Sequence, residues 1–167
     1  MAIPRPVRNS ITSSAGSNGC RNASRLLASG APVVLAGDYN VMPTELDVYA
    51  PERWVEDALF RPEVREAFRR PPGQGWTDSL RALHPNERIY TFWKYFRNAF
   101  ARDAGLRIDH LLLSPPIAGR LRAAGVDRAA RGGEHASDHA PAWIEIADTK
   151  SEPPRRVRRE VASAPSS

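Results

Sequence analysis

The fold class is decided by the stretch Pro32-Val33-Val34-Leu35-Ala36-Gly37-Asp38-Tyr39-Asn40. Its first half is a short continuous apolar run that stops at Gly37, which is typical of a buried strand. Side chains two apart in an extended segment point to the same side, so Asp38 and Asn40 are expected to project together from the strand end, where α/β folds bind ligands. A carboxylate can hold a metal or take a proton from water, and a carboxamide can ligate or donate. The alternative is a plain turn, because Gly, Asp and Asn favour turns.

The sequence around this stretch mixes strand and helix patterns. Extended segments are predicted at 90–96, 107–114 and 140–146, and helical ones at 24–28, 44–47, 63–70, 77–83 and 118–123. Thr77 is expected to cap its helix, and Pro71 with Pro72 to end the helix before it. Strands interleaved with helices indicate an α/β layered fold.

Composition divides the chain into three parts. Residues 1–24, rich in Ser, Asn, Gly and Pro, and the basic tail 148–167 are expected to be disordered, which leaves a partial folded domain at 25–147. Residues 31–147 contain 15 Arg or Lys and 16 Asp or Glu, whereas the two ends contain 9 basic and 3 acidic residues. The basic charge therefore belongs to the tails, where contact with phosphates or plain solvation are both open.

Several classes of protein are excluded by the residue types present. One cysteine rules out an intrachain disulfide framework and a Cys-rich zinc site. No apolar stretch reaches the roughly 18 residues of a spanning helix, and the first 30 residues lack the apolar core of a secretory signal. A cytoplasmic location with no membrane partner is the default expectation.

A second motif, Arg107-Ile108-Asp109-His110, leads into three leucines. An acid inside an apolar strand is unfavourable unless it is paired. Asp109 is therefore expected either to form a salt bridge with Arg107 or another arginine, or to accept a hydrogen bond from a histidine and fix its tautomer.

The third motif, Ser137-Asp138-His139-Ala140-Pro141, precedes the last predicted strand. A histidine beside a carboxylate at a strand entrance can bind a metal or act on a phosphate, although taken alone it could be a surface pair without a role. All three motifs lie at loop–strand boundaries, which favours one shared site.

The order and the amino-acid sequences of these motifs resemble those of the exonuclease III/AP endonuclease branch of the endonuclease–exonuclease–phosphatase family. The resemblance runs from about residue 25 to residue 146. It rests on Val33-Val34-Leu35-Ala36-Gly37-Asp38-Tyr39-Asn40-Val41, Trp76-Thr77-Asp78, Tyr90-Thr91-Phe92-Trp93, Gly105-Leu106-Arg107-Ile108-Asp109 and Ser137-Asp138-His139-Ala140-Pro141.

The resemblance implies a role for each of these residues. Asp38 and Asn40 would orient the attacking water and hold phosphate or metal. Asp138 and His139 would bind metal and the scissile phosphate, with Asp109 supporting His139. The resemblance also implies that Phe92 and Trp93 wall a pocket for the sugar of an abasic site, although buried aromatics also serve as plain core.

The family places further site residues, among them a metal-binding Glu, in an N-terminal half that has no counterpart before Asp38. The expected fold is therefore the C-terminal half of a two-sheet, four-layer α/β sandwich of the DNase I type, from a truncated gene or a misassigned start.

The expected function is that of exodeoxyribonuclease III, namely Mg²⁺- or Mn²⁺-dependent hydrolysis of double-stranded DNA at abasic sites and 3′ ends in base excision repair. This chain alone would be weak or inactive, and the missing N-terminal half would be a further partner. The alternatives are a non-catalytic remnant or binding module, and a phosphatase or phosphodiesterase of the same family.

Overall fold

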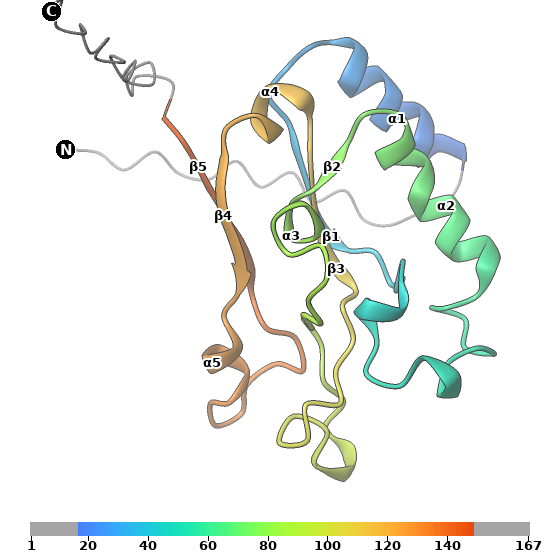
Figure 1. Cartoon of the computed structure of the whole chain (residues 1–167), viewed down its shortest axis with the longest axis vertical. Helices are drawn as coiled ribbons and strands as arrows, with labels where there is room; N and C mark the ends of the chain where they lie inside the picture. The colour runs from blue at the N-terminus through green and yellow to red at the C-terminus, as the bar shows by residue number, and fades with distance from the viewer. Residues whose placement is uncertain (1–16, 149–167) are drawn as a thin grey trace, which may run out of the picture.

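A computed structural model of the chain describes residues 17–148 (Figure 1). Of the segments expected to be disordered, residues 1–16 and 149–167 lie outside this range. Residues 17–24 were expected to lack structure, but they form the first part of helix α1 (Ser17–Ala28). Their weak helix propensity is overridden by packing, because Ala23, Leu26 and Leu27 belong to an apolar cluster that includes Phe68 of a second helix.

The remaining elements follow in chain order: β1 (Val34–Asp38), η1 (Glu45–Asp47), η2 (Pro51–Arg53), α2 (Pro62–Gly73), β2 (Thr77–Asp78), α3 (Ser79–Leu83), η3 (Phe96–Asn98), β3 (Asp109–Leu113), α4 (Pro115–Ala118), β4 (Leu121–Val126), α5 (Arg128–Arg131) and β5 (Ala142–Ile146). The expected mixture of helices and strands is confirmed.

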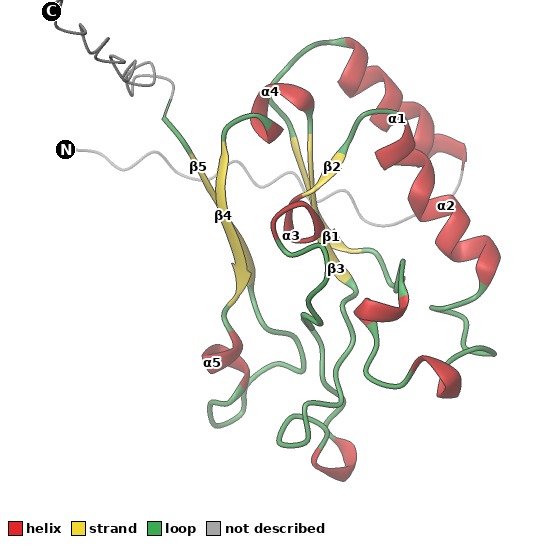
Figure 2. Ribbon diagram, viewed as in Figure 1, coloured by secondary structure: helices red, strands yellow, loops and turns green. Residues whose placement is uncertain are grey.

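The elements are arranged in layers (Figures 1 and 2). Three strands form an antiparallel sheet in the order β1-β3-β2, and β4 pairs with β5 in a separate two-stranded sheet. Helices α1 and α2 lie on one side of the three-stranded sheet, and the β4–β5 pair lies on the other. The short helix α3 contacts both β3 and β4. The two sheets therefore meet beside β3.

Strand β1 differs from the expected buried strand. It pairs only with β3 in the described part of the chain, and four of its five residues are exposed, including Val34 at 37%. Its apolar run reflects contact on one face, where Leu35 joins the cluster beneath α1 and α2. The continuous apolar pattern thus identified a strand correctly but predicted too much burial.

Three local predictions are corrected by tertiary contacts. Helix α2 continues through Pro71 and Pro72 and ends at Gly73, so the two prolines lie in its last turn. Residues 118–123 were expected to be helical, but the second half of this segment belongs to β4, which pairs with β5 from Leu121 to Val126. Helix α3 is capped by Asp78 rather than Thr77, and the Asp78 side chain accepts from the Arg81 N–H.

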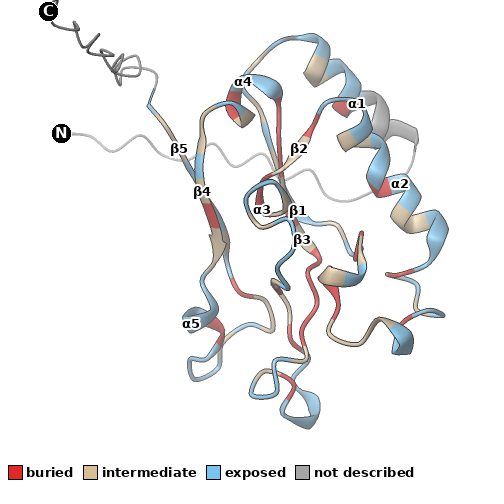
Figure 3. Ribbon diagram, viewed as in Figure 1, coloured by how far each residue is buried: buried red, intermediate tan, exposed pale blue. Residues whose placement is uncertain are grey.

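The buried residues lie where the layers face each other, while the outer surfaces of α1 and α2 are mostly exposed (Figure 3). One apolar cluster lies between the helices and β3, around Phe68, Trp76 and Leu112. A second joins the 42–60 region to Leu106 and Ile108. Among residues 17–148, no helix is long and apolar enough to cross a bilayer.

Candidate active site

Asp38 and Asn40 lie at the end of β1 and contact each other directly. The Asn40 N–H donates to Asp38 Oδ1 at 2.9 Å, and Asn40 Nδ2 donates to Asp38 Oδ2 at 3.2 Å. Asn40 has a φ of 51°, a left-handed conformation that asparagine tolerates better than most residues. The segment is therefore a turn, and this turn also brings the Asp38 and Asn40 side chains together.

Asp109 lies directly opposite Asp38 in the antiparallel pairing of β1 with β3. Opposed residues of antiparallel strands present their side chains on the same face of the sheet. The first and second sequence motifs therefore place two carboxyl groups side by side.

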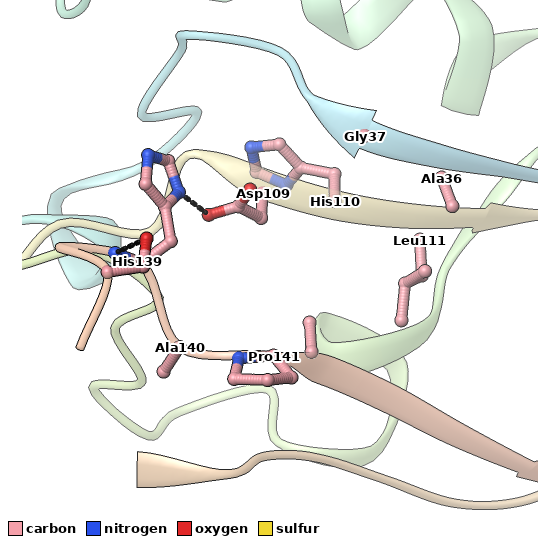
Figure 4. Close-up of a pocket in the computed structure, with 10 residues that line it drawn as sticks. Ala36, Gly37, Asp109, His110, Leu111, His139, Ala140 and Pro141 are labelled. Atoms are coloured by element: carbon pink, nitrogen blue, oxygen red, sulfur yellow. Dashed lines mark hydrogen bonds and ion pairs between the residues drawn. The ribbon is translucent and has the colours of Figure 1, made fainter. Parts of the chain in front are cut away.

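The third motif reaches the same place from the other sheet (Figure 4). His139 Nδ1 lies 2.8 Å from Asp109 Oδ2, and the two side chains point toward one another. An ionised carboxylate only accepts hydrogen bonds, so Nδ1 carries the proton and Nε2 is left free for a ligand. The predicted contact between Asp109 and a histidine is confirmed, and the alternative salt bridge to Arg107 is not formed.

Arg107 is occupied elsewhere, in a buried ionic cluster. Its guanidinium donates to Asp47 at 2.6 Å and to Asp78 at 2.8 and 3.0 Å, and Arg81 also donates to Asp47 at 2.6 Å. Burial, the largest single influence, would raise the pKa of Asp47, but Arg107, Thr44 and Arg81 together outweigh it and lower this pKa. Nothing in the sequence pattern predicts this cluster except a charged residue next to an apolar strand.

His110 follows Asp109 in β3 but faces away from the candidate site. It is fully buried, its Nε2 lies 3.0 Å from the Val41 carbonyl, and its ring packs on Phe68. Burial, reinforced by the charge of Arg107, lowers the pKa of His110 to about 4. This histidine is therefore a neutral core residue.

Phe92 and Trp93, both expected to wall a substrate pocket, separate into two environments. The Phe92 ring is half-buried and lies 5.0 Å from the His139 ring, edge to face. The Trp93 side chain is only 2% exposed, packs with Tyr90 and Ala140, and donates from Nε1 to Asp103. Phe92 thus adjoins the site, whereas Trp93 is a core residue.

Two cavities border these residues. An inter-sheet cleft of about 370 Å³ lies between β1, β3 and the start of β5, and Asp109, Leu111, His139 and Pro141 are among its lining residues. Figure 4 shows Leu111 projecting from β3 into this space. An aromatic pocket of about 270 Å³ is lined by Tyr49, Trp54, Phe92, Lys94, Phe96 and Leu106, among others. Phe92 therefore separates His139 from a pocket of aromatic and basic character.

The predicted metal ligands are Asp38, Asn40, Asp138 and His139. The oxygen atoms of Asp38, Asn40 and Asp138 suit Mg²⁺ in kind, whereas His139 offers only a ring nitrogen. Nevertheless, no group of three or more His, Cys, Asp or Glu side chains in residues 17–148 is placed to hold a metal ion. The backbone carbonyl of Asp138 accepts from the Trp93 N–H at 2.9 Å, which anchors this residue beside the site. The described residues thus include ligand atoms of the type that a hard divalent cation binds, but too few of these residues lie close enough together to hold one.

Known proteins share this sequence over part of their length. The chain is 38% identical over 117 residues to the DNA repair nuclease APEX1 of Danio rerio, covering 70% of this chain and 36% of that protein. It is 35% identical over 122 residues to exodeoxyribonuclease III of Haemophilus influenzae, covering 69% of this chain and 46% of the relative. The chain therefore spans less than half the length of these curated relatives.

Solved structures share the fold. The 3′ phosphatase NExo from Neisseria, bound to product DNA hairpin, superposes with a TM-score of 0.74 at 37% identity, covering 77% of this chain and 50% of that one. An AP endonuclease from Archaeoglobus fulgidus gives a TM-score of 0.68 at 33% identity, covering 77% and 53%. The expected fold class, part of a DNase I-like α/β sandwich, is confirmed.

The family model of the Endonuclease/Exonuclease/phosphatase family matches residues 4–139. The match begins well before residue 25, where the resemblance in the motifs starts, and includes the motif residues Asp38, Asn40, Asp109, Asp138 and His139. The sequence match, the shared fold and the Asp109–His139 contact agree, and the chain belongs to the Endonuclease/Exonuclease/phosphatase family.

Proposed function

We propose that this chain forms part of a DNA repair nuclease of the exonuclease III type, which hydrolyses phosphodiesters at abasic sites and at 3′ ends of double-stranded DNA. The observation that carries the proposal is the Asp109–His139 pair, held at 2.8 Å beside Asp38 at the mouth of the inter-sheet cleft. The similarity of the chain to a DNA repair nuclease and to an exodeoxyribonuclease III supports the same substrate class.

Each residue has a role that follows from its contacts. In its protonated form, His139 donates from Nδ1–H to Asp109 and from Nε2–H to a phosphoryl oxygen, and so stabilises charge that develops there. The exposed Asp38 carboxylate orients the attacking water for in-line attack on phosphorus, and Asn40 holds that carboxylate in place through Nδ2. The Phe92 ring packs against His139 and offers an apolar wall to a deoxyribose without a base.

Metal dependence belongs to the same proposal. Asp38, Asn40, Asp138 and His139 would supply part of the shell of a Mg²⁺ or Mn²⁺ ion, and at least one further carboxylate must come from a segment outside residues 17–148. The unmatched half of the longer relatives is the natural source of that ligand. This half is therefore the proposed partner, and the isolated chain is expected to turn over far below about 1 s⁻¹.

The test restores the missing part. The chain is co-expressed with the N-terminal half of an intact relative and assayed on a duplex with one abasic site and on a duplex with a recessed 3′ end, each with Mg²⁺ and with chelator. His139→Ala and Asp38→Ala are each expected to lower the rate by about 10²-fold or more. Asp109→Asn is expected to lower it less, because it misorients His139 without removing it.

His135→Ala is the matched control, since His135 lies on the same loop with a side chain that is 92% exposed. Wild-type rates in His139→Ala would refute the assignment of the third motif. Binding of DNA without turnover in the completed enzyme would favour a non-catalytic binding module. Turnover confined to phosphomonoesters or to phosphodiesters other than DNA would favour another activity of the family.

A further inference from the structure

The two members of the Asp109–His139 pair lie on segments that enter different sheets. Asp109 begins β3 of the three-stranded sheet, and His139 precedes β5 of the two-stranded sheet. β3 and β5 are not neighbours in either sheet. No strand ladder therefore joins the two residues, although β3 and β5 contact each other.

Residues 91–93 connect the two sides. On one edge the N–H groups of Thr91 and Phe92 donate to the Leu106 carbonyl at 2.8 and 2.9 Å. On the other edge the Ala140 N–H donates to the Thr91 carbonyl at 2.7 Å, and the Trp93 N–H donates to the Asp138 carbonyl at 2.9 Å. This connecting segment thus bonds both to the chain leading into β3 and to the chain on either side of His139.

Thr91 adds a side-chain contact that its neighbours in the segment do not make. Its side chain is fully buried, and Oγ1 accepts from the backbone N–H of Ile108 at 3.2 Å and of Asp109 at 3.1 Å. The hydroxyl therefore fixes the backbone of Asp109, while the carbonyl of the same residue fixes the residue after His139.

We propose that Thr91 is a positioning residue that sets the separation of Asp109 Oδ2 and His139 Nδ1. The catalytic importance of this separation rests on the proposed function, in which the Asp109–His139 pair acts on phosphate. The hydrogen bond of 2.8 Å weakens steeply once its angle at the hydrogen falls below about 120°, so it depends on the orientation of the Asp109 backbone. Without the hydroxyl, two buried N–H groups lose their acceptor, and the backbone at Asp109 must shift to recover one.

Thr91 could instead be a packing residue whose hydroxyl has no effect on the pair. Thr91→Val keeps the shape and removes the acceptor, whereas Thr91→Ser keeps the acceptor and removes a methyl group. The two substitutions therefore separate positioning from packing.

The readout is the tautomer of His139, measured by long-range ¹H–¹⁵N NMR of the full chain at about pH 9. We expect the Nδ1–H form in wild type and in Thr91→Ser. Thr91→Val should lower the Nδ1–H fraction about twofold or more, toward the mixture of an unconstrained imidazole.

Ser114→Ala is the matched control. Ser114 is another buried hydroxyl that ties two segments, accepting from the Val33 N–H at 2.8 Å and donating to the Ala31 carbonyl at 3.0 Å, but at the other end of β3. It should leave the His139 tautomer unchanged. An unchanged tautomer in Thr91→Val, or an equal change in Ser114→Ala, would overturn the proposal.

If Thr91→Val does not fold, amide hydrogen exchange of the wild type replaces it. The Ile108 and Asp109 amides should exchange as slowly as those within β3, and exchange at the rate of exposed amides would overturn the proposal. Neither measurement requires turnover. If the tautomer prediction fails, the proposed nuclease function still stands and is tested by the nuclease assay. If the completed enzyme is inactive, the NMR measurement still tests whether Thr91 positions Asp109 and His139.

Discussion

Replacing Asp47 by Asn tests whether the buried ionic cluster stabilises the fold. The Asp47 side chain is fully buried and accepts from Arg107 Nε, from Arg81, and from both the N–H and the hydroxyl of Thr44 at 2.6–2.8 Å. In Asp47→Asn the amide oxygen can replace only one carboxylate oxygen, and the amide nitrogen opposes a donor. Arg107, with a 1% exposed side chain, keeps Asp78 but loses one of its two counter-charges.

Removing one partner of a buried ion pair destabilises a protein by about 3–5 kcal/mol. This loss would be a large fraction of the roughly 5–15 kcal/mol stability of a typical domain. Urea unfolding followed by tryptophan fluorescence measures it, since Trp54, Trp76 and Trp93 are all buried. Glu52→Gln is the matched acid-to-amide control, because Glu52 pairs with Arg53 on the surface at 3.9 Å with both side chains at least 70% exposed.

The same cluster predicts a dependence on pH. The pKa of Asp47 is lowered in the folded state, so its contribution is complete above the unfolded value of about 3.9 and is lost as the pH falls through the lower folded value. Asp47→Asn should therefore flatten the loss of stability below about pH 4. A destabilisation below about 1 kcal/mol, or one equal to that of Glu52→Gln, would refute the reasoning.

Two further predictions concern His110 and Phe92. Burial lowers the pKa of His110 to about 4, so its contribution to stability is complete above the unfolded pKa of about 6.5 and should be lost between about pH 6.5 and 4. NMR titration should show the His110 ring unprotonated at pH 5. A titration midpoint near the unfolded pKa would contradict the assignment of His110 as a buried neutral residue. In the completed enzyme, Phe92→Ala should reduce cleavage at abasic sites more than 3′-exonuclease activity, because the ring lies between His139 and the aromatic pocket. Leu46→Ala is the control, because Leu46 is half-buried and apolar but lines neither cavity, and it should affect the two activities equally. If Phe92→Ala also reduces both activities equally, the Phe92 ring serves only as a core residue.

The amino-acid sequence by itself determined the three polar motifs and their positions at strand ends. An apolar run followed by Gly37 and Asp38 indicates a strand and its end, whatever the rest of the chain does. The residue types also restricted the chemistry, since an acid within an apolar strand requires a partner. Of the two partners considered for Asp109, the histidine is correct and the arginine is not.

Only the tertiary structure decided which partner each group took. Arg107 is two residues from Asp109, yet it pairs with Asp47 and Asp78, because α3 and the 44–47 turn bring those carboxylates beneath it. Asp109 is thereby left for His139, which lies 30 residues away on a segment that enters another sheet. A local sequence pattern cannot predict which partner each group takes, because the pairing depends on burial and charge contributed by segments distant in the chain.

The same reason explains the elements that were predicted incorrectly. Residues 118–123 have helical propensity, but pairing with β5 supplies backbone hydrogen bonds and covers Ala124, so a strand forms. Phe92 and Trp93 are adjacent aromatic residues, and the backbone pairing of Phe92 with Leu106 and His139 sends one ring to the site and the other into the core. Sequence determined which groups are available for chemistry, and long-range packing decided which of them meet.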